Sequence, residues 1–147
     1  MRLALTILPL VVLASACSKG DDAPAAPAAE MAAPAVLGGV DLNQPLRAIG
    51  TEPFWGVEIT PQSLVYSGVD RAEQRATNAG PVIQGTTAVY TAATGSGAAL
   101  VVTLIATECS DGMSDRIYPL TARVELSGET LNGCAASQAS LDAQPAP

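Results

Sequence analysis

The sequence predicts an all-β protein, a small antiparallel barrel or sandwich of about seven short strands with one disulfide. Between residues 40 and 135, short runs rich in apolar and β-branched residues alternate with turn residues such as Thr94-Gly95-Ser96-Gly97. The run from Leu120 to Leu126 alternates strictly between apolar and polar side chains, as a strand with one buried face does. The runs expected to form strands are 46–49, 54–60, 63–67, 86–92, 98–107, 120–126 and 130–134.

Two segments of this β domain depart from simple alternation. Residues 98–106 (AALVVTLIA) are apolar at almost every position, which predicts a central strand that is buried on both faces. Residues 71–76 (RAEQRA) are mostly polar, and we interpret them as a loop or a single helical turn.

Residues 1–16 have the parts of a secretory signal peptide. Arg2 supplies a positive charge, Leu3 to Leu13 is the apolar stretch, and small residues precede Cys17. The run Ala14-Ser15-Ala16-Cys17 resembles the bacterial lipobox. That resemblance implies that the Cys17 thiol is lipidated and that Cys17 becomes the first residue of the mature protein. The alternative is an ordinary signal-peptidase site at the same place, with Cys17 left as a free thiol.

The mature chain is expected to have three parts. Residues 17–39 carry the lipid and continue as an Ala/Pro-rich, disordered tether to the membrane. Residues 40–135 form the β domain, and residues 136–147 are interpreted as a disordered tail. Ser18, rather than an aspartate, follows Cys17. By resemblance to enterobacterial sorting, this implies an outer-membrane anchor with the domain facing the periplasm.

The chain has three cysteines. Lipidation of Cys17 leaves Cys109 and Cys134 as a pair, and a disulfide between them is worth roughly 3.5 kcal/mol in the chain-entropy model. A redox-active pair is the alternative. However, the chain has no Cys-x-x-Cys motif and no neighbouring base that would lower a thiol pKa. We therefore expect a structural disulfide.

The composition excludes several kinds of chemistry. The chain has no histidine, which excludes Ser-His-Asp and Cys-His catalysis and His-ligated zinc or copper sites. The formal net charge is -7 and there is no basic stripe, so we expect no nucleic-acid partner. An acidic surface favours a cationic protein partner, although solubility alone also explains such a charge.

Three segments stand out as motifs: GTEPFW at residues 50–55, CSDGMSDRIYP at residues 109–119 and LNGC at residues 131–134. Phe54 and Trp55 are adjacent on a predicted strand, so their side chains must point to opposite faces. One of them fills the core, and the other is covered by a loop, faces solvent or lines a ligand site. Either both are packed, one of them under the loop that follows Cys109, or Trp55 belongs to a recognition patch.

Together these segments resemble a family of uncharacterised bacterial envelope lipoproteins. That family combines G-[TN]-E-P-F-W, C-x-D-G-M-S-D-R-x-Y-P and a terminal L-x-G-C, and the match covers most of residues 46–135. In size and context it is distantly similar to META-type domains and to membrane-bound lysozyme inhibitors. The resemblance implies an envelope location and implies no mechanism.

The loop at residues 111–116 concentrates polar groups. We expect a mainly structural loop, in which Asp111-Gly112 makes a turn, Asp or Ser side chains cap backbone amides, and Arg116 pairs with Asp115 or Glu52. A hard-cation site is the alternative, but its ligands are few, and we expect neither a metal nor a cofactor. The residues that would form a binding surface are Trp55, Glu52, Asp111, Ser114, Asp115 and Arg116.

The function expected from these features is that of a lipid-anchored, non-enzymatic binding or accessory module. One alternative is an inhibitor of a cationic cell-wall hydrolase, which the charge and the family neighbourhood favour. Another is a carrier of a small apolar ligand in a barrel cavity. Converging carboxylates in a cleft would instead indicate an enzyme, and paired carboxylates at Glu108, Asp111 or Asp115 are the residues to inspect for that.

Overall fold

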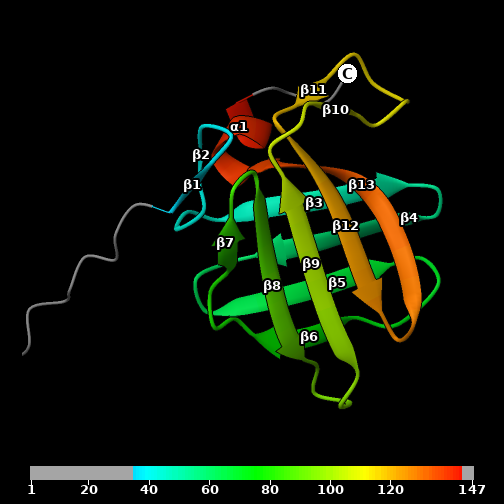
Figure 1. Ribbon diagram of the computed structural model, residues 1–147. Coiled ribbons are helices and arrows are strands. Elements are labelled where there is room, and N and C mark those ends of the chain that lie inside the picture. Colours follow the sequence, from blue (N-terminus) through cyan, green and yellow to red (C-terminus); the bar gives the residue numbers. More distant parts are fainter. Residues whose placement is uncertain (1–34, 144–147) are drawn as a thin grey trace, which may run out of the picture. The chain divides into compact units, whose positions relative to one another are not determined.

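The structure, a computed structural model, describes residues 35–143 and is dominated by one curled antiparallel sheet (Figure 1). The sheet has nine strands in the order β6-β5-β4-β3-β13-β12-β9-β8-β7. Its strands are β3 Leu46–Thr51, β4 Phe54–Ile59, β5 Ser63–Gly68, β6 Gln74–Thr77, β7 Val82–Gln84, β8 Thr87–Ala93, β9 Ala99–Ile105, β12 Leu120–Leu126 and β13 Glu129–Ser137. The all-β prediction is confirmed, and the architecture is a half-barrel.

The curl brings the two ends of the sheet together. β6, at one edge, meets the end of β8 through a bridge between Ala76 and Thr94, and the Gly95 amide donates to the Arg75 carbonyl at 3.0 Å. Thr94 is 5% exposed, and its hydroxyl accepts from the Ala98 amide at 3.1 Å within the β8–β9 turn. The contact covers the open edge of β6 with the strand next to the other edge strand, β7, which is one way a curled sheet protects an edge.

The core lies on the inner side of this curl. The largest fully buried side chains are Tyr66, Tyr90, Leu46, Ile59, Leu64, Leu100, Leu104, Leu120, Leu126, Val57, Val102 and Val124. Burial raises the pKa of Tyr90 to about 12, and its buried hydroxyl has no hydrogen-bond partner among the described residues. The inner side of the half-barrel is therefore a filled, strongly apolar interior.

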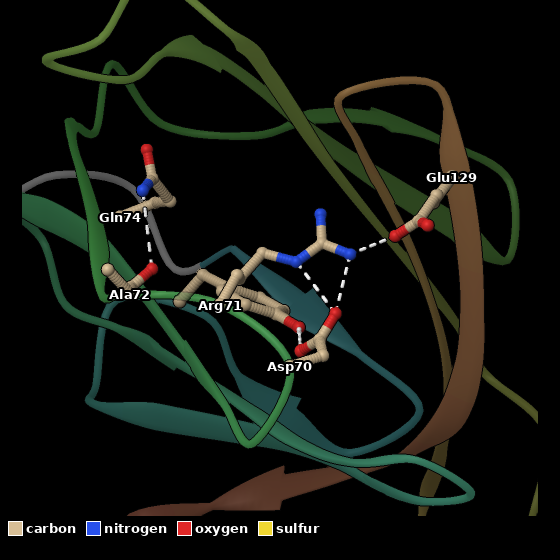
Figure 2. A network of polar contacts seen from close by, with 6 residues as sticks. Asp70, Arg71, Ala72, Gln74 and Glu129 are labelled. Atoms are coloured by element: carbon tan, nitrogen blue, oxygen red, sulfur yellow. Dashed lines mark hydrogen bonds and ion pairs between the residues drawn. The ribbon is translucent and has the colours of Figure 1, made fainter.

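A polar network ties the β5–β6 loop to Glu129, the first residue of β13 (Figure 2). Arg71 donates from Nε to Asp70 Oδ2 at 2.8 Å, and its Nη2 reaches both Asp70 and Glu129. The Tyr66 hydroxyl donates to the other oxygen of Asp70 at 3.2 Å. The Arg71 guanidinium lowers the pKa of Asp70 below its ordinary value. The loop is thus tied to strands that are not its neighbours in the sheet.

Two local predictions were wrong. β9 buries only one face, with Leu100, Val102 and Leu104 fully buried and the alternate residues exposed or half-buried. A half-barrel has a single interior, so even a strand of apolar residues in its middle has an outer face. Residues 71–76 are neither a plain loop nor a helical turn, because β6 begins at Gln74 and pairs with β5.

The predicted domain limits were also wrong at both ends. β1 (Val36–Leu37) and β2 (Val40–Asp41) form a small hairpin whose Leu37 is 2% exposed, so the domain includes part of the expected tether. β13 continues to Ser137, and the helix α1 (Gln138–Ala143) follows it, where we predicted a tail. Pairing with β3 extends the strand, because Ala135, Ala136 and Ser137 find partners there. The expected signal peptide and Cys17 lie outside the described residues.

The Trp55 indole is packed against two glycines on neighbouring strands. Gly50 on β3 pairs directly with Trp55, and a Cβ atom added at Gly50 would overlap the indole ring. A Cβ at Gly133 on β13 would overlap the Ile49 carbonyl oxygen and lie 2.9 Å from Trp55 Cζ2. Both positions therefore exclude any side chain, and the large ring occupies the space that the glycines leave.

Replacing Gly133 with alanine is expected to destabilise the domain by about 1–3 kcal/mol or more, as overpacking of a well-filled core does. The free energy of unfolding in urea measures this. Gly56→Ala is the matched control on β4, because a Cβ there would make only ordinary contacts, the nearest at 3.6 Å. Equal stability of Gly133→Ala and the wild type would contradict the packing described for Trp55.

Candidate functional site

The outer side of the sheet carries an open groove of about 640 Å³ over strands β3, β4 and β5. Volumes of this size are typical of sites for small ligands. We call it the outer groove. It is lined by Arg47, Ile49, Gly50, Thr51, Phe54, Trp55, Gly56, Ser67, Gly68, Val69, Asp111, Met113 and Ser114.

The floor of the outer groove includes Gly56, which has no side chain and is buried. Gly56 pairs with Ile49 on one side and with Ser67 on the other, so the three form a row across the sheet. A Cβ at Gly56 would lie 3.7 Å from Ser67 Oγ and 3.8 Å from Arg47 Nη2. The side chains of Ser67 and Arg47 therefore flank the space above this glycine.

The rim of the groove is apolar and exposed. Phe54 is 55% exposed, Val69 is 77% exposed and Met113 is 67% exposed. They come from three separate elements: β4, the β5–β6 loop and the β10–β11 loop. Large apolar side chains that are exposed singly need no explanation, but a group of them around one groove makes that groove a candidate binding surface.

One wall of the groove is a hairpin that lies outside the main sheet. It consists of β10 (Cys109–Ser110) and β11 (Ile117–Tyr118), which pair only with each other (Figure 1). The predicted disulfide is confirmed and joins Cys109 at the start of β10 to Cys134 in β13. Tyr118 and Cys134 form a second small core on the outer face with Ala136.

The loop of this hairpin is organised by Asp111. One carboxylate oxygen accepts from the amides of Ser114 at 2.8 Å and Met113 at 3.0 Å. The other accepts from the hydroxyls of Ser114 at 2.8 Å and Tyr118 at 3.0 Å. The backbone bonds from Ser114 and Met113 lower the pKa of Asp111 to about 2. The expectation that Asp and Ser side chains cap the loop amides is confirmed.

The hairpin is also fastened to the sheet beside the groove. The Thr51 hydroxyl on β3 donates to the Asp111 carbonyl at 3.2 Å. Together with the disulfide, this contact fixes where Met113 and Ser114 stand over β3 and β4. The hairpin that forms this wall is therefore held against the sheet by a disulfide and a hydrogen bond, and not by strand pairing.

The residues that we predicted to form a binding surface do not all lie in the outer groove. Asp111, Ser114 and Trp55 all line the outer groove. Glu52 is exposed in the β3–β4 turn and lines another, smaller groove of about 480 Å³ along the hairpin. Asp115 is exposed, and the Arg116 guanidinium lies 5.9 Å from the centre of the Tyr118 ring.

Placing the Trp55 side chain in a recognition patch was wrong, and so was the alternative that Phe54 and Trp55 are both packed. Trp55 is only 4% exposed and packs on the inner side of the sheet, whereas Phe54 faces outward. Sequence reasoning also missed Arg47, Val69 and Met113. Alternation along 46–51 and 54–59 would have placed Arg47 and Phe54 on the same outer face. No local signal brings Val69 and Met113 to that face.

Neither a metal centre nor a membrane-spanning helix is found within the described residues. In residues 35–143, no three Asp, Glu or Cys side chains gather closely enough to hold a metal ion. The helix of this part of the chain is too short to cross a bilayer. Of the carboxylates singled out, Asp111 is the one in the outer groove, and both its oxygens are engaged by the loop.

No known protein family matches the chain, and no curated protein or solved structure matches it. The resemblance to an envelope lipoprotein family therefore stays a prediction. The three motif segments do meet in space, because Trp55 packs beside Gly50 and Gly133 while Cys134 holds the hairpin. The motif residues thus build one region around the outer groove.

Acidification is expected to loosen the hairpin loop selectively. Because the pKa of Asp111 is lowered in the fold from 3.8 to about 2, its contribution to loop stability is complete above pH 4 and is lost as pH falls toward 2. Amide exchange at Met113 and Ser114, followed by NMR, measures this. Asp111→Asn should show fast exchange already at neutral pH, and Asp115→Asn on the same loop is the control. Slow exchange in Asp111→Asn would contradict the role of the carboxylate.

Proposed function

We propose that this protein is a lipid-anchored lipoprotein of the bacterial envelope whose β domain is a non-enzymatic binding module. The outer groove is its binding site. The observation that carries this proposal is the exposed rim of Phe54, Val69 and Met113 around one groove. Exposed apolar area of this kind gains free energy when a ligand covers it, at about 25 cal/mol per Å².

The construction of the groove supports binding rather than catalysis. The chain has no histidine to act as a base. The Asp111 carboxylate accepts four hydrogen bonds within its own loop, and its pKa of about 2 makes it a poor base. A rigid sheet and a disulfide-held wall instead keep a binding surface in shape, which lowers the entropic cost of binding.

The alternatives have weaker support. A carrier with an internal cavity is disfavoured because large side chains such as Tyr66 and Tyr90 fill the inner side of the half-barrel. A cationic protein partner, such as a cell-wall hydrolase, finds support in the net charge and in exposed acidic residues near the hairpin, Glu52, Glu108 and Asp115. Binding that weakens steeply with salt would favour that partner.

Removing an apolar rim residue is expected to weaken binding of an apolar probe. We expect Phe54→Ser to lower the affinity for N-phenyl-1-naphthylamine, a neutral fluorescent probe, roughly tenfold, which corresponds to ~1.4 kcal/mol. Val36→Ser is the matched control, because Val36 is 54% exposed, nearly the same as Phe54 at 55%, and does not line the groove. Equal affinities of the two variants for the probe would contradict the assignment of the outer groove as the binding site.

The proposed lipid anchor is tested by mass measurement and by substitution of Cys17. The mature protein should carry acyl chains on its first residue, visible as added mass, and should partition into detergent with the membrane fraction. Cys17→Ala should remove that mass and release the protein into the soluble fraction, whereas Ser18→Ala should stay lipidated. An unmodified Cys17 thiol in the wild-type protein would refute the anchor while leaving the groove assignment standing.

A further inference from the structure

We propose that the outer groove binds an alkyl chain that ends in a carboxylate, with the carboxylate at the Arg47 guanidinium above Gly56 and the chain extending from there toward Phe54. This inference rests on the proposed function, since it names the ligand class of the same groove. Its basis is the position of one guanidinium above the floor of the groove and the position of the apolar rim beside it.

Arg47 is the cationic residue among those that line the outer groove. Its guanidinium lies over the floor, with Nη2 3.8 Å from the point where a Gly56 Cβ would be. The ion pair that it forms with Glu58 is long, at 4.0 Å, and both side chains are exposed, 42% and 61%. Such a pair contributes little, and the five N–H donors of an arginine leave capacity for a second carboxylate in a bidentate contact.

The charges set the direction of the ligand. Asp111, the acidic residue of the groove lining, is fastened near Thr51 at the other end of β3. The Arg47 guanidinium reaches the row of Gly56 and Ile49, and Ile49 is two residues from Thr51, which corresponds to about 7 Å along a strand. An anionic head at the guanidinium therefore lies one residue pair away from the Thr51 end, where Asp111 is fastened, and the apolar part of the ligand reaches Phe54 and Met113.

The floor of the groove favours an alkyl chain over a peptide. β3 pairs with β13 and β4, and β4 pairs with β3 and β5, so the backbone groups of the floor are already engaged in the sheet. A peptide lying on this face would find no free strand edge for its amide groups, and unpaired amides are costly to bury. An alkyl chain brings no such groups, and Ser67 is the hydroxyl that the floor presents to its head.

The test compares octanoate with octan-1-ol, which share a chain length and differ in charge. Binding is measured by displacement of N-phenyl-1-naphthylamine. We expect octanoate to bind about tenfold more tightly than octanol, the advantage that a charge-assisted contact supplies.

Variants assign this advantage to Arg47. Arg47→Gln should bring octanoate down to the affinity of octanol without changing octanol, and Arg47→Lys should keep part of the advantage. Arg123→Gln is the matched control, because Arg123 is also half exposed and paired with a glutamate, Glu125, but lies outside the groove. Circular dichroism of each variant checks that the fold is intact.

The outcomes separate this inference from the proposed function. Equal affinities for octanoate and octanol, no binding of either, or an advantage that persists in Arg47→Gln would overturn the inference. So would tighter binding of an acetylated trileucine peptide with a free carboxyl terminus, since the ligand would then be a peptide. In all these cases the Phe54→Ser and Val36→Ser comparison still decides the proposed function on its own.

Discussion

The packing of one indole ring against two glycines is the constraint on which the rest of the domain depends. Trp55 on β4 reaches across Gly50 on β3 to Gly133 on β13, and neither glycine position has space for a Cβ atom. Three neighbouring strands are thereby held in one register on the inner side of the sheet. The residue after Gly133 is Cys134, which faces outward and carries the disulfide to the hairpin. One short stretch of β13 therefore organises both faces of the sheet.

The outer groove is a consequence of that inner packing. Because Trp55 and Val57 point inward, alternation turns Phe54 and Gly56 outward, and the pair supplies an apolar rim beside a floor position without a side chain. The disulfide and the Thr51–Asp111 contact then bring Met113 over the same strands. Asp111 keeps the loop in shape with its own carboxylate, so its charge serves the structure of the wall. Arg47 is the cationic residue of the groove lining, and its guanidinium lies above Gly56.

Much of the fold was predictable because the signals were local. The alternation in 120–126 and the turn around Gly95-Ser96-Gly97 identified β12 and the β8–β9 hairpin, and the cysteine count identified the disulfide. The errors came where partners far along the chain decided the outcome. The prediction for the polar segment 71–76 was wrong because β6 forms only by pairing with β5. The prediction of a disordered tail was wrong because the end of β13 pairs with β3, and the first residue of α1 donates a hydrogen bond to the Pro45 carbonyl.

The sequence by itself determined the β class, the pairing of Cys109 with Cys134 and the rule that Phe54 and Trp55 face opposite sides. Each of these follows from composition or from spacing along the chain, which needs no knowledge of distant partners. Only the tertiary structure decided which of the two aromatic residues is buried, because that choice depends on Gly50 and Gly133 leaving room for the indole. It also created the outer groove, whose rim joins residues 54, 69 and 113. These residues lie close together because the sheet curls and the hairpin folds back onto it. No local sequence pattern predicts that they are neighbours.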